Sequence, residues 1–366
     1  MIKRVLISGG GTGGHIFPAI SIANQIKQNN PDAEILFVGA ENKMEMTKVP
    51  EAGYTIIGLP IQGFERKLSF KNFILIFKLI GSLFKAAKVV RKFKPQVVVG
   101  VGGYASGPLL YIASKKGIPT LIQEQNSYAG ITNKILSKKA KSICVAYDNM
   151  DKFFPKDKIV MSGNPVRKDI FGIENVDKDQ AYSSFGLDKN KKTILIVGGS
   201  LGARTLSNSL IENIEKIASL NNVQVMCQTG RYYYNNVKEK VEASKATNII
   251  FTQFIKQMNW AYSIADVIIS RAGAGTISEL CIVGKPVILV PSPNVAEDHQ
   301  TQNALALVKK EAAILVKDTN ANIMIDEAMT ILNSNDKADK LSENIKKLAI
   351  LNSSEIIINE LERLIK

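Results

Sequence analysis

The amino-acid sequence predicts an α/β fold with two doubly wound domains, and three features of the chain indicate it. Its 366 residues are enough for two domains of about 150 residues each. Short β-branched runs alternate with segments of helix length, which is typical of parallel sheets covered by helices. The alternation restarts near residue 192, after a polar, turn-rich stretch at 162–192. We therefore expect one domain over residues 1–162 and a second over residues 163–349.

The first domain is expected to contain strands at RVLIS, EILFVG, QVVVGVGG, PTLIQEQ and SICVA. In the second domain the corresponding runs are TILIVGGS, VQVMCQTG, NIIFTQF, DVIISRAG and PVILVPSP. Doubly wound domains bind ligands at the carboxyl ends of their strands, so we expect these ends to face a deep cleft between the domains. The last segment, residues 350–366, has the pattern of an amphipathic helix that could pack back on the first domain, although periodicity alone does not select a domain.

Hydropathy and cysteine content indicate a protein of the cytoplasm. No apolar run of about 18 residues or more is present, and the N-terminus lacks a cleavable hydrophobic segment. The three cysteines, Cys144, Cys227 and Cys281, lie singly in apolar surroundings and are expected in the core. No cluster of His, Cys, Asp and Glu has metal-ligand spacing, so we expect neither a metal nor a cofactor.

The positive charge of the chain is concentrated in its first half. Residues 1–163 hold 23 Lys and Arg against 10 Asp and Glu, which accounts for nearly all of the net charge of +14. Such one-sided charge indicates an anionic surface, either nucleic acid or a phospholipid membrane. A nucleic-acid-binding module would need aromatic platforms or a reader motif, and the sequence contains neither. We therefore expect a membrane partner and no nucleic acid.

Residues 69–94 carry the pattern expected of a membrane-facing helix. Lysines recur at every seventh position there, so on a helix they form one stripe beside large apolar residues. Taken alone, the pattern fits an ordinary helix with a solvated charged face at least as well. The candidate membrane residues are Lys71, Ile74, Phe77, Lys78, Lys85, Lys88 and Lys92.

Four glycine-rich loops follow predicted strands, at residues 8–14, 100–108, 198–204 and 270–279. Glycine allows main-chain N–H groups and helix N-termini to approach a phosphate or a sugar closely, although it also simply permits tight turns. The first loop matches G-x-G-x-x-G, which also occurs in NAD-dependent oxidoreductases. Those enzymes need an acidic residue at the end of the second strand, whereas this strand ends at Gly39, with Glu41 two positions later. Loops in both halves therefore favour a nucleotide-sugar site.

Seven motifs then occur in an order and spacing that resemble the bacterial MurG family over nearly the whole chain. They are GGGTGGHIFPAI, VGVGGYASGP, QEQNSYAGITNKIL, GNPVR, GGSLGAR, SRAGAGTISEL and EDHQTQNA. The resemblance implies the two-domain GT-B fold and an inverting transfer of N-acetylglucosamine (GlcNAc) from UDP-GlcNAc. The implied acceptor is the 4-hydroxyl of the N-acetylmuramic acid in lipid I, the undecaprenyl-pyrophosphoryl muramyl-pentapeptide, and the product is lipid II for peptidoglycan synthesis. Such an enzyme would lie peripherally on the cytoplasmic face of the cell membrane. A relative that transfers a hexose to diacylglycerol is the alternative.

An inverting transfer requires a base for the acceptor hydroxyl, and His15 is the first candidate because imidazole accepts protons near neutral pH. The alternative is a structural histidine at the start of a helix, or one that only orients the acceptor. Many family members carry His before EQN, where this chain has Gln123. That difference strengthens His15 and makes Glu124 an untested second candidate, while His299 would line the site at most.

The resemblance also implies the residues that contact the substrates. Arg167 and Ser200 would approach the diphosphate, with an interdomain ion pair as the alternative role of Arg167. Glu279 would accept hydrogen bonds from ribose hydroxyls, or else stabilise a helix dipole from the first helical turn. Ile255 and Met258 would offer backbone and apolar surface to uracil, or belong to the core. The other expected contacts are Thr12, Gly13, Gly14 and Asn126 with the sugars, Gly102, Gly103 and Tyr104 with the acceptor or diphosphate, Ala274, Gly275, Thr276, Ile277 and Ser278 with ribose and sugar, and Gln300 with a GlcNAc hydroxyl.

Overall fold

The computed structural model describes residues 1–62, 70–199 and 201–366, without the side chains of residues 70–74 and 296. The chain forms two compact units. The first contains Met1–Val166 together with Ile350–Lys366, and the second contains Arg167–Ala349. Each unit is built on one parallel sheet, and the predicted class of two doubly wound α/β domains is confirmed.

The first unit contains a seven-stranded parallel sheet in the order β3-β2-β1-β4-β5-β6-β7. Its strand order reverses between β1 and β4, which are hydrogen-bonded neighbours. In doubly wound sheets this reversal is where the strand ends leave room for a ligand. The strands are β1 (Arg4–Gly9), β2 (Glu34–Ala40), β3 (Thr55–Leu59), β4 (Val97–Gly102), β5 (Thr120–Glu124), β6 (Ser142–Val145) and β7 (Ile159–Met161).

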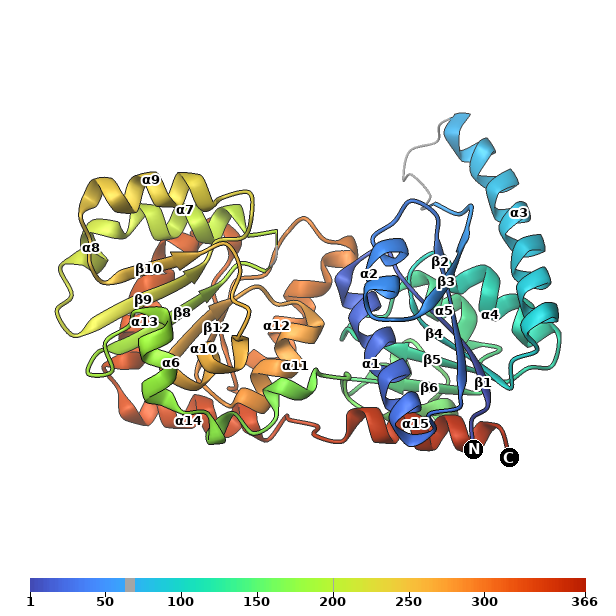
Figure 1. The fold of residues 1–366 in the computed structure, drawn as a ribbon. Helices are drawn as coiled ribbons and strands as arrows, with labels where there is room; N and C mark the ends of the chain where they lie inside the picture. The colour runs from blue at the N-terminus through green and yellow to red at the C-terminus, as the bar shows by residue number, and fades with distance from the viewer. Residues whose placement is uncertain (63–69, 200) are drawn as a thin grey trace. The chain divides into compact units, whose positions relative to one another are not determined.

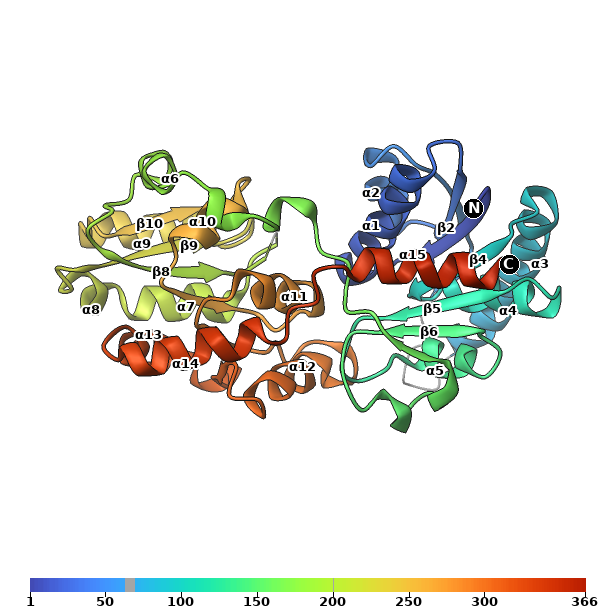
Figure 2. The ribbon, with the colours of Figure 1, turned by 90° about the horizontal axis from the view of Figure 1, so that it is seen from below.

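Helices cover both faces of this sheet and bury a core on each side. One core joins the sheet to α1 and α15, through side chains such as Ile22, Ile357 and Leu361. The other joins it to α3, α4 and α5. Figure 2 shows α15, in red, lying along the first unit, so the C-terminal segment is part of the same unit as the N-terminus. The helices are α1 (Gly13–Asn29), α2 (Glu45–Glu51), α3 (Phe70–Phe93), α4 (Ser106–Lys115), α5 (Ile131–Ser137) and α15 (Ser353–Leu364).

The second unit contains a six-stranded parallel sheet in the order β10-β9-β8-β11-β12-β13, with its reversal between β8 and β11. The strands are β8 (Lys192–Val197), β9 (Val223–Gln228), β10 (Ile249–Thr252), β11 (Val267–Ser270), β12 (Val287–Leu289) and β13 (Ile314–Leu315). The helices are α6 (Lys178–Phe185), α7 (Arg204–Glu212), α8 (Ile214–Ala218), α9 (Tyr234–Ser244), α10 (Met258–Ile264), α11 (Ala274–Val283), α12 (His299–Val308), α13 (Met324–Leu332) and α14 (Asn335–Lys346).

Short 3₁₀ turns connect several of these elements. They are η1 (Met150–Lys152), η2 (Lys156–Lys158), η3 (Lys168–Ile170), η4 (Ile173–Asn175), η5 (Ala296–Asp298) and η6 (Asp318–Ile323). Three short strands, β3, β7 and β13, were not expected from the sequence. All three lie at sheet edges and are only partly buried.

The three cysteines are buried, as predicted, and burial raises the pKa of each thiol to about 12. They are therefore protonated core residues at neutral pH. Within residues 1–62, 70–199 and 201–366, no helix is both long and apolar enough to cross a membrane.

Candidate active site

The first glycine loop follows β1 and leads into α1, and His15 is the third residue of that helix. Its Nδ1 lies 2.9 Å from the carbonyl oxygen of Gly10. Because a carbonyl oxygen only accepts, Nδ1 carries the proton and the neutral ring has its lone pair on Nε2. The side chain is half-buried. This arrangement is the one that a base using Nε2 requires.

The loop after β4 lies directly against this histidine. A Cβ added to Gly102 would lie 2.7 Å from Cδ2 and Nε2 of the imidazole, and one added to Gly103 would lie 2.5 Å from the Gly10 carbonyl oxygen. Both residues have positive φ, +109° and +89°. Glycine is therefore required at both positions by close approach as well as by backbone conformation. The next residue, Tyr104, is exposed.

The start of α1 has the properties of an anion-binding helix end. Thr12 is the N-cap residue but makes no side-chain capping hydrogen bond, and the first turn holds no acidic residue. The glycines at 13 and 14 add no side chain that would cover the main-chain N–H groups there. An unneutralised helix N-terminus of this kind favours a negatively charged ligand.

Glu45 was not expected from the sequence to belong to this region. It is the first residue of α2, is 1% exposed, and accepts hydrogen bonds from the N–H groups of Gly11 at 2.8 Å and Ala40 at 3.0 Å. The carboxylate thus holds the first glycine loop against the end of β2. A Cβ added to Gly10 or Gly39 would overlap the Glu45 side chain, so the glycines at these two positions are the sequence signal that fits this contact.

Glu124, the second candidate base, is buried at the end of β5 and is hydrogen-bonded at both carboxylate oxygens. Oε1 accepts from the Asn126 N–H at 3.1 Å, while Oε2 accepts from the Gly130 N–H at 3.0 Å and from Asn133 Nδ2 at 2.8 Å. These bonds fix the loop that carries Asn126 and the start of α5. The geometry therefore favours His15 over Glu124 for proton transfer.

Gln123 takes part in a buried amide network where many family members carry an imidazole. Its Nε2 donates to Oδ1 of Asn164 at 2.9 Å, and its Oε1 accepts from Gln125 Nε2. Asn164 Nδ2 in turn donates to the Gln125 carbonyl at 3.1 Å. The three side chains are fully buried, so Gln123 supports the strand end and does not face solvent.

In the second unit, Arg167 forms an ion pair with Glu279, with Nε 3.0 Å from Oε1. The hydroxyl of Tyr262 donates to Glu279 Oε2 at 3.4 Å. Burial raises the pKa of Glu279, and the charge of Arg167 partly offsets that rise. Both members of this pair lie in the second unit. The first-turn alternative for Glu279 is wrong, because Glu279 is the sixth residue of α11.

The rest of the SRAGAGTISE motif forms the first turns of α11. Its N-cap, Gly273, supplies no capping side chain, and the first turn contains no acidic residue. Ala274 and Ile277 are buried, whereas a Cβ on Gly275 would meet open space. Ser278 Oγ donates to the Ala274 carbonyl at 3.1 Å. Main chain at Ala274, Gly275 and Thr276 is thus what this segment can offer a ligand.

Ile255 and Met258 are core residues, since their side chains are only 2% and 6% exposed. The Ile255 N–H donates to Oε1 of Gln228 at 2.9 Å. The core interpretation is confirmed for both side chains. The expected contact of these two residues with uracil stays a prediction.

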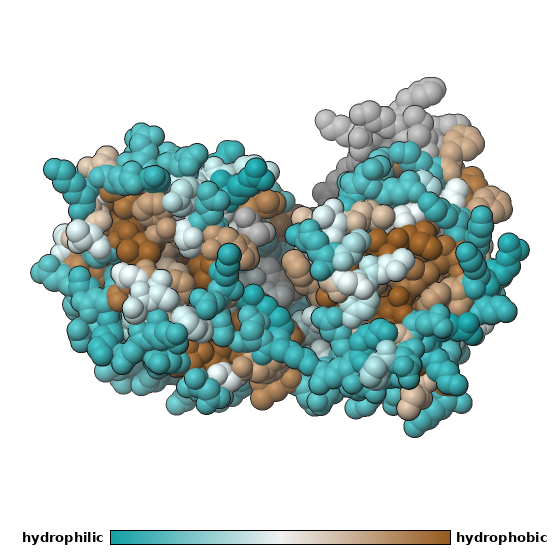
Figure 3. Space-filling view, viewed as in Figure 1, coloured by the Kyte–Doolittle hydropathy of each residue, from teal (hydrophilic) through white to brown (hydrophobic). Residues whose placement is uncertain are grey.

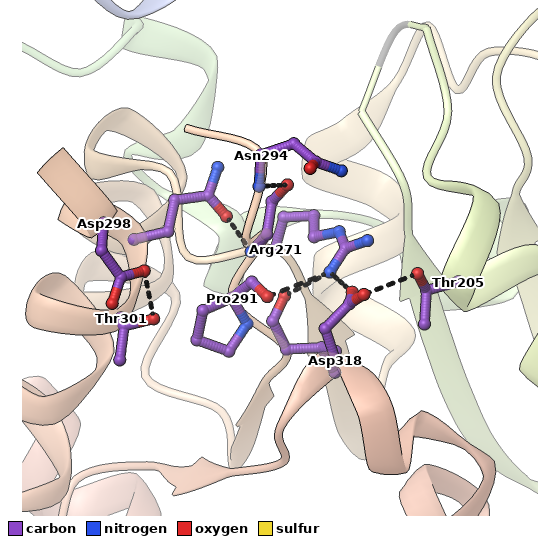
Figure 4. Close-up of polar contacts among 10 residues, drawn as sticks. Thr205, Arg271, Pro291, Asn294, Asp298, Thr301 and Asp318 are labelled. Carbon is purple, nitrogen blue, oxygen red and sulfur yellow. Dashed lines mark hydrogen bonds and ion pairs between the residues drawn. The ribbon is translucent and has the colours of Figure 1, made fainter. Parts of the chain in front are cut away.

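Gln300, at the start of α12, accepts a hydrogen bond from the Ser292 N–H through Oε1 at 2.8 Å. This leaves its amide NH₂ group to donate to a sugar hydroxyl. A second interaction supports the same loop (Figure 4), because Arg271 donates to the carbonyls of Val290 at 3.0 Å and Pro291 at 3.3 Å.

Arg271 also pairs with Asp318, which the sequence did not single out. Asp318 accepts in addition from the hydroxyl of Thr205, at 3.0 Å, in the first turn of α7 (Figure 4). These contacts therefore join the start of α7 to the segments that follow β11, β12 and β13 at one end of the sheet. Ser200, in the loop after β8, lies outside the described residues.

Helix α3 presents an apolar and basic surface. Phe77 and Phe84 are 66% and 75% exposed, and Lys85, Lys88 and Lys92 are exposed beside them. In Figure 3, apolar residues lie among hydrophilic ones on the part of the first unit where Figure 1 places α3. Lys78 is half-buried and donates to Gln62. The side chains of Lys71 and Ile74 lie outside the described residues.

Comparisons with known proteins match both halves of the chain to one family. Residues 5–145 match the glycosyltransferase family 28 N-terminal domain, and residues 193–360 match the C-terminal domain of the same family. A Bacteroides fragilis protein named UDP-N-acetylglucosamine--N-acetylmuramyl-(pentapeptide) pyrophosphoryl-undecaprenol N-acetylglucosamine transferase is 58% identical over 99% of this chain and 95% of its own. A protein of that name from Bacteroides thetaiotaomicron is 58% identical over 99% and 97%.

Among solved structures, Acinetobacter baumannii MurG superposes with a TM-score of 0.79 and 30% identity, covering 99% of both chains. Both family models match in order along the chain, and the close relatives extend over nearly all of it. The chain therefore belongs to glycosyltransferase family 28.

Proposed function

We propose that the chain transfers GlcNAc from UDP-GlcNAc to the 4-hydroxyl of the muramic acid in lipid I, with inversion, and so forms lipid II for peptidoglycan synthesis. The relatives named above carry this activity in their names and are 58% identical over nearly the whole chain. The observation that carries the mechanism is the hydrogen bond from His15 Nδ1 to the Gly10 carbonyl. It leaves Nε2 of the neutral ring able to accept a proton.

In the proposed reaction, His15 Nε2 takes the proton of the acceptor hydroxyl as its oxygen attacks the anomeric carbon of GlcNAc. The new bond joins that oxygen to the anomeric carbon, and the bond from this carbon to the diphosphate breaks. UDP leaves with the electron pair. Because the attack comes from the face opposite the leaving group, the configuration inverts. His15 is thus a general base, and the proton later passes from the imidazolium to solvent.

We assign the leaving diphosphate to main-chain N–H groups and one guanidinium. The uncapped start of α11 and the Arg167 side chain both favour negative charge. In the structure Arg167 is paired with Glu279. Binding of the nucleotide would replace this pair, so that Arg167 contacts phosphate and Glu279 accepts from the ribose hydroxyls. Ser200, Thr276 and Gln300 complete the proposed donor contacts.

We assign the α3 surface to the membrane that holds the lipid-linked acceptor. Exposed phenylalanines beside lysines suit the boundary between acyl chains and anionic headgroups. Each basic residue near such a surface adds about 1 kcal/mol. The protein would thus bind peripherally at the cytoplasmic face of the membrane, where lipid I would reach the loops of the first unit.

The decisive experiment supplies purified protein with radiolabelled UDP-GlcNAc or UDP-galactose, each with a lipid I analogue or with diacylglycerol. We expect labelled product only from UDP-GlcNAc and the lipid I analogue. Product from diacylglycerol would identify the chain as a lipid hexosyltransferase instead. No product from UDP-GlcNAc and the lipid I analogue would refute the proposed function.

A further inference from the structure

We propose that Glu45 is a positioning residue for His15 and acts through the single peptide group that joins Gly10 to Gly11. The inference rests on the proposed role of His15 as the base and extends it. Glu45 lies in α2, 30 residues further along the chain, and its carboxylate accepts from the N–H groups of Gly11 and Ala40.

Three groups form one hydrogen-bonded series. Glu45 Oε2 accepts from the N–H of Gly11 at 2.8 Å. The carbonyl at the other side of that same peptide bond belongs to Gly10, and it accepts from His15 Nδ1 at 2.9 Å. The order is therefore carboxylate, peptide group, imidazole. A histidine base is commonly oriented by a carboxylate that accepts directly from Nδ1, and here a peptide group stands between the two.

The orientation of this peptide group is fixed from several directions. The Gly10 N–H points at the carbonyl of Gly102, at 3.3 Å, and the main chain of Gly103 packs on Gly10. The carboxylate itself occupies the space where a Gly10 side chain would lie. Its other oxygen, Oε1, accepts from the Ala40 N–H at 3.0 Å. The carboxylate therefore has one position, and so does the peptide group that it contacts.

A buried negative charge beside the N–H polarises the whole peptide group. Hydrogen bonds in series strengthen one another when water is excluded, and Glu45 is 1% exposed. The Gly10 oxygen then becomes a better acceptor for Nδ1–H. This holds the ring in the tautomer whose lone pair is on Nε2 and stabilises the positive charge that the ring gains when Nε2 takes the proton.

The test replaces Glu45 by Gln, which has the same shape but no charge and presents an NH₂ group to one of the two N–H donors. The matched control is Glu51→Gln, an exposed carboxylate on the same helix. We expect kcat of Glu45→Gln to fall about 10- to 100-fold, the value of one charged hydrogen bond, while KM for UDP-GlcNAc stays within about twofold. Glu51→Gln should match the wild type.

A double-mutant cycle shows whether Glu45 acts through His15. If it does, Glu45→Gln should change kcat less than about twofold once His15 is already Ala, because the group that it orients is gone. An equal loss in both backgrounds would overturn the proposal. If kcat falls in His15→Ala but stays normal in Glu45→Gln, this proposal is overturned and the proposed base is not. If kcat stays near normal in His15→Ala, the proposed base itself is refuted.

A spectroscopic signature separates orientation from simple loss of structure. The chain contains only two histidines, so ¹⁵N-histidine labelling gives two imidazoles, and His299→Gln assigns them. We expect the neutral His15 ring to carry its proton on Nδ1 in the wild type and to gain the Nε2–H form in Glu45→Gln. Should that variant not fold, Glu45→Asp, whose shorter carboxylate cannot reach both N–H donors, replaces it. A wild-type ring protonated on Nε2, or an unchanged ring in the variant, would overturn the proposal.

Discussion

Gly103→Ala tests whether the contact between the two glycine loops of the first unit organises the site. At φ +89° an alanine costs about 1–2 kcal/mol by conformation alone. Its Cβ would also lie 2.5 Å from the Gly10 carbonyl oxygen and 3.0 Å from the Gly10 nitrogen. These are main-chain atoms that cannot rotate away, so overpacking adds about 1–3 kcal/mol. The expected loss in the free energy of unfolding is therefore about 2–5 kcal/mol.

Gly53→Ala is the matched control, because Gly53 has φ +86° but no atom within 4 Å of an added Cβ. It should cost only the conformational part, about 1–2 kcal/mol. Urea unfolding followed by circular dichroism measures both variants. Gly103→Ala should also lower kcat, since it displaces the Gly10 carbonyl that holds His15, whereas Gly53→Ala should not. Equal losses of stability in the two variants, or a Gly103→Ala enzyme with wild-type kcat, would refute the reasoning.

Three further predictions concern other parts of the chain. Burial raises the pKa of Glu279, so the folded wild-type protein loses stability as the pH rises and this carboxyl ionises. Glu279→Gln should therefore become more stable relative to the wild type as the pH rises, and a stability difference that stays constant from pH 4 to 7 would contradict this. Asp318→Asn leaves Arg271 without its ion-pair partner and should raise KM for UDP-GlcNAc about tenfold, since the Gln300 loop loses support; an unchanged KM would count against it. Replacing Phe77 and Phe84 together by Ser should weaken flotation with anionic liposomes at least about tenfold. Leu351→Ser, which changes a similarly exposed residue of the same unit, should not weaken it, and equal effects would refute the assignment of the α3 surface to the membrane.

Much of the fold was predictable because internal parallel strands are marked by continuous apolar runs. β4, for example, is buried at every residue of VVVGVG. The three missed strands lie at sheet edges, and two of them, β7 and β13, have only three and two residues, too few to show a strand pattern. Periodicity also could not place α15, because an apolar stripe shows that a helix is buried but not against which partner. Its contacts with α1 come from residues more than 300 positions away.

The candidate site was predictable where a motif is local and hidden where contacts are distant in the sequence. His15 and the glycines around it occur in one stretch, and the hydrogen bond to Gly10 spans five residues. Glu45 and Asp318 act on loops that lie far from them along the chain, and each carboxylate reads in sequence as an ordinary surface charge. Burial then changed the interpretation of Ile255 and Met258, because apolar type alone does not distinguish a ligand contact from core.

The most direct test of the central claim measures kcat for His15→Ala and His15→Gln with saturating UDP-GlcNAc and lipid I analogue. Glutamine can still donate a hydrogen bond toward the Gly10 carbonyl but cannot take up a proton at neutral pH. If His15 is the base, both variants lose about 10²- to 10⁴-fold in kcat. A His15→Gln enzyme that kept most of the wild-type kcat would show that the side chain only orients the acceptor, and it would contradict the account.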